Sequence, residues 1–285
     1  MEIAALHDAA TFLRVAAPVL ERSPAANNLL LGIAQRLVDH PDAYDEAFLW
    51  VAEHQGKVVG AAVQTPPYPA VIADPLDDGV IPALVARLAE ERPELPGVTA
   101  NEPWGTRFAD AWTAATGASS RLAIAQGVFV LTSVEPYRSA SGAPRPATQE
   151  DRELLVAWFR AFEQEALQAT IRDEDFADRD LSVRLSSGAT AGVTLWEDEG
   201  APVCLTGWGR IPGGARIGPV YTPPEHRGRG YASSLVAHVS YEMLSRGAEA
   251  CFLYTDLANP TSNAIYRRLG YEQIAESAMF AFGEA

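Results

Sequence analysis

The sequence predicts an α+β fold in two tandem domains, each a mostly antiparallel mixed sheet flanked by helices. Three observations predict it. The chain has 285 residues, which exceeds the roughly 100–200 residues of a usual single domain. Strand-like and helix-like patterns follow a similar order in both halves. Between the halves lies EPYRSASGAPRP, a stretch rich in Pro, Ser, Gly and Ala with no hydrophobic period.

This stretch sets the expected boundaries: a first domain over residues 1–134, a linker over 135–146 and a second domain over 147–285. Thr148 follows the linker at once and can cap a helix. The apolar residues of that helix recur at a spacing of three to four, which is typical of one buried face. They are Leu154, Leu155, Trp158, Phe159, Phe162 and Ala166.

The second domain continues with an acidic, irregular segment over residues 173–180 and then three strand-like runs, 192–196, 203–210 and 215–221. Asp, Glu, Gly and Pro residues fill the two connections between the runs, as they do in tight turns. The three runs are therefore expected to form an antiparallel meander.

A helix is expected after the meander, with its apolar stripe at Ala232, Leu235, Val236, Val239 and Met243. Gly247 is placed to end it with a left-handed cap. A strand over 250–254 and a short helix over 261–269, ended by Gly270, come next. A strand or bent strand pair over 271–282 is expected to close this domain.

The first domain shows helical patterns before residue 40 and again near 80–91 and 104–115. Strands are expected over 48–52, 58–64 and 128–131. The turn at 54–57 corresponds in position to the turn at 197–200, which favours an internal duplication over an unrelated partner domain. The match is one of pattern and not of residues, and a generic α+β domain would give some of the same order.

Composition limits the classes of function. Hydrophobic residues make up 48% and the formal net charge is −15, which fits a globular protein and disfavours binding to nucleic acid or to an anionic membrane surface. No apolar run is long enough to span a bilayer, so a cytoplasmic location is expected. Cys204 and Cys251 lie in apolar strand-like segments and are expected to be buried, reduced thiols. The histidines show no metal-ligand spacing, so no metal is expected.

The segment that carries chemistry is IGPVYTPPEHRGRGYA, residues 217–232. It reads as a strand, a proline-containing turn, a glycine-containing loop and the first turn of a helix. A helix N-terminus offers unpaired N–H groups and the positive end of the helix dipole, which suit a pyrophosphate. Gly228 and Gly230 let the backbone approach phosphate oxygens, and Arg227 and Arg229 add positive charge.

The pattern of Arg227, Gly230 and Ala232 between a strand and an amphipathic helix resembles the acyl-CoA signature of the GCN5-related N-acetyltransferase (GNAT) family. NPTSNAIYRRLGYE, residues 259–272, resembles the last helix of that family. Two matching segments in the correct order are more specific than either alone. The resemblance covers residues 148–285, and the first half only by its architecture.

The resemblance implies a set of site residues. The strand before the loop would part from its neighbour and offer backbone groups to the pantetheine arm, and loop amides would hold the pyrophosphate. Asn259 and Asn263 would bond the arm or the reacting groups, Tyr266 would be the general acid, and the amide of Tyr221 or Val220 would bind the oxyanion. The cofactor-binding residues so implied are Val220, Tyr221, Thr222, Arg227, Gly228, Arg229, Gly230, Tyr231, Ala232, Asn259, Asn263 and Tyr266, with Tyr266 and Tyr221 catalytic.

The general base stays open, because residues 217–222 contain no acid. Asp256, at the end of a strand, is the first candidate, although an Asp there commonly caps a turn. A water chain would also serve. The other ionisable residues near the expected site are more typical of solvated positions: Glu163, Glu165, Asp173, Asp175, Glu225 and His226.

The first domain lacks the Arg-x-x-Gly-x-Ala pattern. Asp74, Asp77 and Asp78 stand where a pyrophosphate would have to bind, and they would repel it. This half is therefore expected to be a degenerate copy that shapes the acceptor pocket, braces the active domain or dimerises.

The function that follows is an N-acetyltransferase. It would transfer the acetyl group of acetyl-CoA to the amine of a small molecule or an aminoacyl acceptor, by direct attack in a ternary complex. Two alternatives stay open: a mycothiol-synthase-like tandem acetyltransferase, and a non-catalytic, acyl-CoA-responsive regulatory protein. A small-molecule amine is the expected partner, nucleic acid and membrane are not, and a homodimer is left open.

Overall fold

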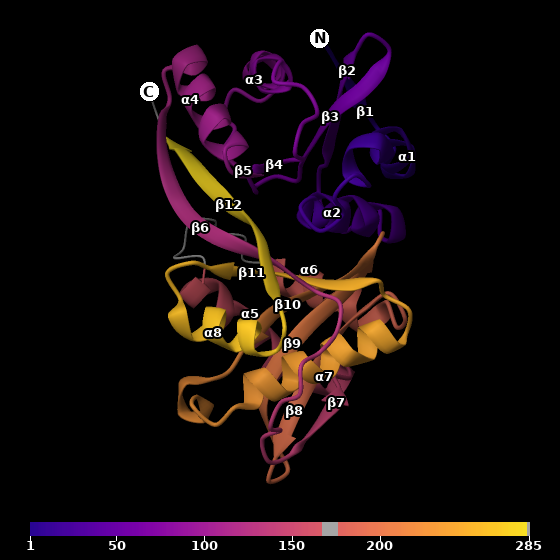
Figure 1. The fold of residues 1–285 in the computed structure, drawn as a ribbon, viewed down its shortest axis with the longest axis vertical. Coiled ribbons are helices and arrows are strands. Elements are labelled where there is room, and N and C mark those ends of the chain that lie inside the picture. The colour runs from indigo at the N-terminus through magenta and orange to yellow at the C-terminus, as the bar shows by residue number, and fades with distance from the viewer. Residues whose placement is uncertain (167–175, 284–285) are drawn as a thin grey trace. The chain divides into compact units, whose positions relative to one another are not determined.

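The structure is a computed structural model that describes residues 1–166 and 176–283 (Figure 1). The chain divides into two compact units. The first unit comprises Met1–Val128 together with Ile274–Ala285, and the second comprises Phe129–Gln273. The mixed α+β class with mostly antiparallel pairing, expected from the sequence, is confirmed.

The first unit has helices on its sheet in the order that the sequence pattern predicts. Its strands are β1 (Glu2–Leu6), β2 (Phe48–His54), β3 (Lys57–Gln64), β4 (Ala70–Ile72), β5 (Gly97–Asn101) and most of β6 (Ser119–Leu131). Its helices are α1 (Ala9–Leu20), α2 (Asn28–Asp39), α3 (Val80–Glu91) and α4 (Trp104–Thr116). Strands β1 to β4 pair antiparallel in sequence, and β4 pairs parallel with β5.

The second unit repeats this order element by element. Its strands are β7 (Ala143–Pro146), β8 (Ala191–Asp198), β9 (Ala201–Ile211), β10 (Gly214–Tyr221) and β11 (Ala250–Asp256). Its helices are α5 (Arg152–Ala166), α6 (Phe176–Ser186), α7 (Tyr231–Ser245) and α8 (Pro260–Arg268), with short 3-10 turns at Gln149–Asp151 and Pro224–His226. Strands β7 to β10 are antiparallel, and β10 pairs parallel with β11. The predicted meander and duplication are thus present in the structure.

The turns between the second and third strands of the two units make the duplication visible at the level of single residues. Gln55 and Gly56 have φ angles of 52° and 73°, and Glu199 and Gly200 have φ angles of 51° and 81°. Two successive residues with positive φ are the mark of the tight hairpin turn whose twist matches the strands on either side. The same turn conformation occurs at the same place in both units.

The last strand, β12 (Glu272–Gly283), differs from the prediction. It pairs antiparallel with β5, from Ser277 opposite Asn101 to Ala281 opposite Gly97, so it completes the sheet of the first unit and does not close the second. In the second unit the corresponding neighbour of β11 is the end of β6. The last strand of each repeat therefore pairs in the sheet of the other unit. The periodicity of residues within a strand does not indicate which sheet the strand will join.

Residues 135–146 also differ from the predicted linker. Glu135 N–H donates to the carbonyl of Leu269 at 3.0 Å, and Ala140 N–H donates to Ser234 Oγ at 2.8 Å. The final four residues form β7 at the sheet edge. The prolines there suit an edge strand, because they have no N–H to donate to a ladder. This segment is part of the second unit.

Alternating side chains divide the core of the second unit between the two faces of its sheet. Trp196 and Cys204 join a cluster with α7 and α8, whereas Leu195 and Leu205 join one with α5 and α6. Thr148 begins the helical region with a capping box, as expected. The acidic segment expected to be irregular is helical from residue 176 onward, and residues 167–175 lie outside the described part.

Cys204 and Cys251 are buried and free, as the sequence predicts. In the part of the chain that the structure describes, no helix has the length and apolar character needed to cross a membrane.

Strand β12 anchors itself in the first unit through aromatic packing, which gives a test of the exchange. The ring of Phe282 stacks on Trp112 at 5.3 Å between centroids and lies 6.4 Å from Phe108. Phe282→Ala is expected to lower the free energy of unfolding by about 1–3 kcal/mol, because a partly buried ring is removed from a packed cluster. Hydrogen exchange of β5 amides should rise.

Ile274→Ala is the matched control, since Ile274 lies on the same strand and is 43% exposed. It should leave exchange of β5 unchanged. Loss of protection in β11 and not in β5 after Phe282→Ala would contradict the strand assignment.

Candidate functional site: a parted strand pair beside a helix start

The site begins where two parallel strands stop pairing. Among the described residues, β10 and β11 pair only from Gly214 to Arg216, although β10 continues to Tyr221 and β11 to Asp256. Strand β9 continues to pair with β10 as far as Tyr221. The far half of β10 is therefore a sheet strand on one side and an open edge on the other.

A bulge in β10 lies at the point of parting. Gly218 and Pro219 stand opposite the single residue Gly207 of β9. Gly218 has a φ angle of 143°, which favours glycine, and a Cβ on Gly207 would lie 2.7 Å from the Gly218 carbonyl oxygen. Bulges bend a strand and re-aim the groups that follow. Two glycines thus let β10 turn from β11 while it stays bonded to β9.

The amides of Val220 and Tyr221 follow this bulge. In an antiparallel ladder, adjacent residues point their N–H groups alternately toward and away from the partner strand. One of these two amides therefore faces the open edge. The Tyr221 side chain points to the face of the sheet that α5 and α6 cover, where its ring centroid lies 6.2 Å from that of Trp158. Burial there raises the pKa of the Tyr221 hydroxyl. Only the backbone of Tyr221 is available at the edge.

The loop after β10 leads into α7 with its donors free. Gly228 and Gly230 have φ angles of 76° and 83°, and Gly230 is the residue before the helix. Within the described chain, no acceptor takes the backbone N–H groups of residues 228–233, and the first such bond runs from Ser234 N–H to the Gly230 carbonyl. In the described part of the chain, no atom beyond Gly228 and its two neighbours lies within 4 Å of the place where a Cβ on Gly228 would stand. Six consecutive donors beside open space fit a polyanion such as a pyrophosphate.

The two predicted arginines have different surroundings. Arg227 donates through Nε to the carbonyl of Thr222 at 2.8 Å and through Nη2 to a carboxylate oxygen of Glu165 at 2.6 Å. The side chains of Arg227 and Glu165 are each 47% exposed. Arg229 is exposed on the loop, where its charge acts on the carboxylate of Asp198. Both arginines therefore lie at the loop, and one of them is already paired with an acid.

Tyr231 and Ala232 begin α7. The Tyr231 side chain is only 3% exposed and belongs to the core cluster, so its ring does not face the open edge. Its predicted part in cofactor binding could therefore come only from its backbone N–H.

The two predicted asparagines hold the turn between β11 and α8. Asn259 caps α8, because its Oδ1 accepts from Ser262 N–H at 3.1 Å. Asn263 donates through Nδ2 to the carbonyls of Asp256 and Leu257 at 3.1 and 3.3 Å. Its Oδ1 is buried and has no partner among the described residues. That oxygen is an acceptor that an amide N–H of a bound ligand could satisfy.

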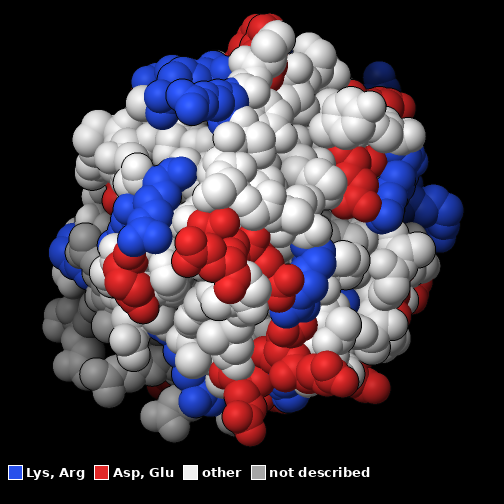
Figure 2. Space-filling view, turned by 90° about the horizontal axis from the view of Figure 1, so that it is seen from below, with Lys and Arg blue, Asp and Glu red and all other residues white. Residues whose placement is uncertain are grey.

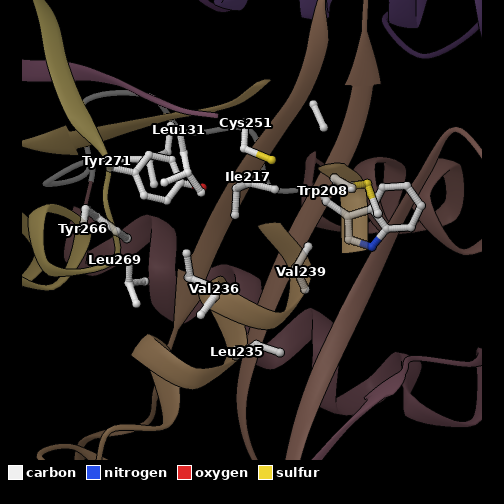
Figure 3. Packing of buried hydrophobic residues seen from close by; sticks show 14 of the residues in the cluster. Leu131, Trp208, Ile217, Leu235, Val236, Val239, Cys251, Tyr266, Leu269 and Tyr271 are labelled. Carbon is white, nitrogen blue, oxygen red and sulfur yellow. The ribbon is translucent and has the colours of Figure 1, made fainter. Parts of the chain in front are cut away.

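Tyr266 projects from α8 into the main core of the second unit, edge-on to Tyr271 at 5.9 Å between ring centroids (Figure 3). Its side chain is 8% exposed, and its hydroxyl has no hydrogen-bond partner in the described parts of the chain. Burial raises the pKa of this hydroxyl, and nearby Cys204 adds to the rise. Tyr266 therefore keeps its proton at neutral pH and has an unused donor.

Thr222 and Cys204 lie near the same point. Thr222 Oγ1 is 3.2 Å from Cys204 Sγ, which joins the end of β10 to the strand beside it. Burial raises the pKa of Cys204 to about 12, so this thiol stays protonated and is a poor nucleophile.

None of the candidate bases is singled out by geometry. Asp256 accepts from Ala258 N–H at 2.8 Å and so caps the turn, which is the common role of an Asp at a strand end. Glu225 is exposed in the loop. Glu163 lies on α5 beside Glu165, and His226 has a buried Nδ1 without a partner among the described residues. Asp173 and Asp175 lie outside the described part.

The matching place in the first unit is closed. Asp74 N–H donates to Asn27 Oδ1 at 3.0 Å, and Asn101 Nδ2 donates to Asp74 Oδ1 at 3.0 Å. These bonds tie the ends of β4 and β5 to the residue before α2. Desolvation raises the pKa of Asp74. At the start of α3, Asp77 Oδ1 already accepts from Gly79 N–H at 2.8 Å. The donors left free in the second unit are thus partly used here by acids of the chain itself.

The sequence patterns did not indicate two side chains near the loop, those of Asp198 and Ser234. The Tyr231 hydroxyl donates to Asp198 Oδ2, and Ser234 Oγ donates to the Gly230 carbonyl at 3.1 Å. The sequence pattern places Asp198 only in a turn, 33 positions before Tyr231. The polar residue Ser234 in the first turn of α7 could have indicated a contact there. No feature of the sequence around Asp198 indicated its contact with Tyr231.

The comparisons with known proteins bear on this geometry. Residues 197–280 match the family model described as FR47-like protein. No curated protein matches the chain. The matched residues include the loop, the parted strands and α8.

Solved structures resemble the whole chain. A tandem GNAT protein from the clavulanic acid biosynthesis pathway has a TM-score of 0.62 at 17% identity, over 100% of both chains. A GCN5-related N-acetyltransferase from Sphaerobacter thermophilus has a TM-score of 0.61 at 18% identity, over 98% of this chain and 94% of that one. A GNAT acetyltransferase from Colwellia psychrerythraea has a TM-score of 0.61 at 9% identity, over 99% and 100%.

At such identities the likeness shows the fold. The chain therefore has the fold of solved tandem GNAT structures, and its residues 197–280 are similar to the FR47-like family.

Proposed function

We propose that the protein transfers the acetyl group of acetyl-CoA to the amine of a small molecule, with the second unit as the catalytic unit. The observation that carries the proposal is the run of unpaired N–H groups over residues 228–233, directly beside the open edge of β10. A strand edge suits the amide groups of a pantetheine arm, and a helix N-terminus suits a pyrophosphate. The two features adjoin in the second unit.

Acetyl-CoA supplies an acyl group activated as a thioester. The amine nitrogen forms a bond to the acyl carbon, the carbon–sulfur bond breaks, and the proton lost by the amine is balanced by protonation of the leaving thiolate. In this proposal, the outward amide at Val220 or Tyr221 donates to the developing oxyanion. No described carboxylate is required as base, since water in the open edge could carry the proton to solvent.

Tyr266 assists the leaving sulfur. A thiol has an ordinary pKa of about 8.5, whereas the pKa of Tyr266 is raised above that of a free tyrosine. Complete proton transfer from Tyr266 to the thiolate would therefore be uphill. The residue acts best by donating a hydrogen bond as negative charge develops, and solvent then completes the protonation.

The charge of the protein favours a cationic or neutral acceptor. The formal net charge is −15, and Asp and Glu side chains form broad patches on one face (Figure 2). Such a field raises the local concentration of an ammonium group and repels anions. Arg227, Arg229 and the helix start give acetyl-CoA its own basic binding place within this field.

The proposal is tested with the purified protein, by titration calorimetry with CoA and by thiol release from acetyl-CoA with a panel of amines. One CoA per chain and acceptor-dependent thiol release are expected. Tight CoA binding without release for any amine would favour the regulatory alternative. Absence of CoA binding would refute both.

Tyr266→Phe removes the donor while it keeps the ring. We expect kcat to fall by roughly 10–100-fold, the worth of a hydrogen bond to a charged group, with little change in the Kd of CoA. Because the pKa of Tyr266 is raised, wild-type kcat should show no loss from its ionisation below about pH 10. Steady-state kinetics from pH 6 to 10 check this, and an unchanged kcat in the variant would remove Tyr266 from the mechanism.

Glu165→Gln removes the acid that holds Arg227. We expect the Kd of CoA to fall by roughly 2–5-fold at low salt, because an exposed ion pair is worth about 1 kcal/mol or less. The gain should shrink at high salt. Arg227→Gln should weaken binding by about tenfold or more.

The matched control is Glu153→Gln, an exposed acid in the first turn of the same helix α5. It makes the same change in net charge away from the loop. Equal effects of Glu165→Gln and Glu153→Gln would show that net charge, and not the ion pair with Arg227, governs binding.

A further inference from the structure

The segment Ala140–Gly142, expected from the sequence to be linker, lies against the start of α7. Ala140 N–H donates to Ser234 Oγ at 2.8 Å, and Ser234 Oγ donates to the Gly230 carbonyl at 3.1 Å. The Ala140 Cβ lies 3.9 Å from the place where a Cβ on Gly230 would stand. The glycine that opens the helix is thus contacted from outside by a segment about 90 residues earlier in the chain.

Ser141 reaches the same helix start by another route. Its Oγ donates to Asp198 Oδ2 at 2.9 Å, and the Tyr231 hydroxyl donates to the same oxygen. Hydrogen bonds from Tyr231 and then from Ser141 hold the pKa of Asp198 below its ordinary value. The carboxylate is therefore ionised at neutral pH and joins the two hydroxyls.

The segment itself is fixed to the sheet. Trp196 Nε1 donates to the Ser141 carbonyl at 2.7 Å, and the Trp196 side chain is buried. Gly142 has a φ angle of 90°, and a Cβ there would lie 2.0 Å from the Glu197 carbonyl oxygen. Only glycine allows so close an approach. Asp198 and Ser141 are thus both tied to β8, Asp198 as its last residue and Ser141 through the bond from Trp196.

An acid beside a phosphate-binding loop needs a reason, because its charge opposes the ligand. Asp198 lies near Arg229, which offsets part of that charge. Its Oδ2 atom also accepts hydrogen bonds from the hydroxyls of Tyr231 and Ser141. The electrostatic cost is balanced if the acid fixes the direction of the unpaired N–H groups, since preorganised donors bind an anion without loss of conformational freedom.

We propose that Asp198 and Ser141 are positioning residues for the pyrophosphate of CoA, acting through Tyr231 on the first turn of α7. The inference rests on the proposed function and deepens it. Neither residue touches the ligand. They hold the helix start and the loop over residues 228–233 in the geometry that a pyrophosphate requires, and they take no part at the reacting thioester.

The test compares two probes, CoA and pantetheine, which lacks the nucleotide and the pyrophosphate. Tyr231→Phe and Ser141→Ala should each raise the Kd of CoA, by roughly tenfold and threefold, about the range expected for lost hydrogen bonds to a charged group. The Kd of pantetheine should stay the same. With a productive amine, the KM of acetyl-CoA should rise while kcat is unchanged.

Two variants serve as matched controls. Tyr241→Phe removes the hydroxyl of a tyrosine on the same helix that is 66% exposed. Ser139→Ala removes a hydroxyl of the same segment whose Oγ donates, among the described residues, only to the neighbouring Ala140 carbonyl. Both should bind CoA and pantetheine as the wild type does.

The outcomes are separable. If the wild type binds CoA no better than pantetheine, the pyrophosphate site and with it the proposed function fail. If the wild type prefers CoA and Tyr231→Phe keeps the full preference, the positioning role is wrong while the proposed function stands. If Tyr231→Phe weakens both probes equally, the hydroxyl has only a structural role, and the inference is also overturned.

Discussion

The constraint on which the site depends is the parting of β10 from β11 beyond Arg216. A strand in the middle of a sheet normally uses its N–H and C=O groups on both sides, so it has nothing left to offer a ligand. At the bulge formed by Gly218 and Pro219, β10 no longer pairs with β11 but stays paired with β9. The chain then crosses to the start of α7, where a second set of backbone donors is left free for a different reason, the geometry of a helix end. Two independent sources of unpaired backbone groups thus meet within one loop.

The two repeats share this framework and use it differently. In the first unit Asn27, Asp74 and Asn101 bond to one another where the second unit stays open. Side chains of the chain itself satisfy groups that a ligand would otherwise satisfy, and the acids there disfavour a phosphate. The last strand β12 follows directly after α8 and pairs in the sheet of the first unit.

Most of the fold could be predicted from residue patterns, and the failures have identifiable causes. Helix α3 and the three strands of the meander were found because their apolar residues recur over several turns or positions. Strands β4 and β7 were missed, since three residues of AVI and the proline-containing APRP carry no readable period. The exchange of β12 and β6 depends on which edges meet in space, and local sequence does not encode that choice.

The candidate site could be predicted where its function lies in the backbone or in a motif. The glycines of the loop are expected from the pattern of a helix start, whereas the part assigned to Tyr266 comes from the resemblance to the GNAT family. The pairing of Arg227 with Glu165, 62 positions apart, does not, nor does the role of Asp198. Tyr231 shows the limit most plainly, because this residue of the motif has its ring in the core and its hydroxyl bonded to Asp198.

The central claim is that acetyl-CoA binds to the open edge and the loop amides of the second unit and not to the first unit, and amide hydrogen exchange in the presence and absence of CoA tests it most directly. The account predicts slower exchange for residues 220–222 and 228–233 when CoA is bound, with no change for residues 72–82 in the first unit. Protection of residues 72–82, or exchange of the loop amides that CoA does not alter, would contradict it.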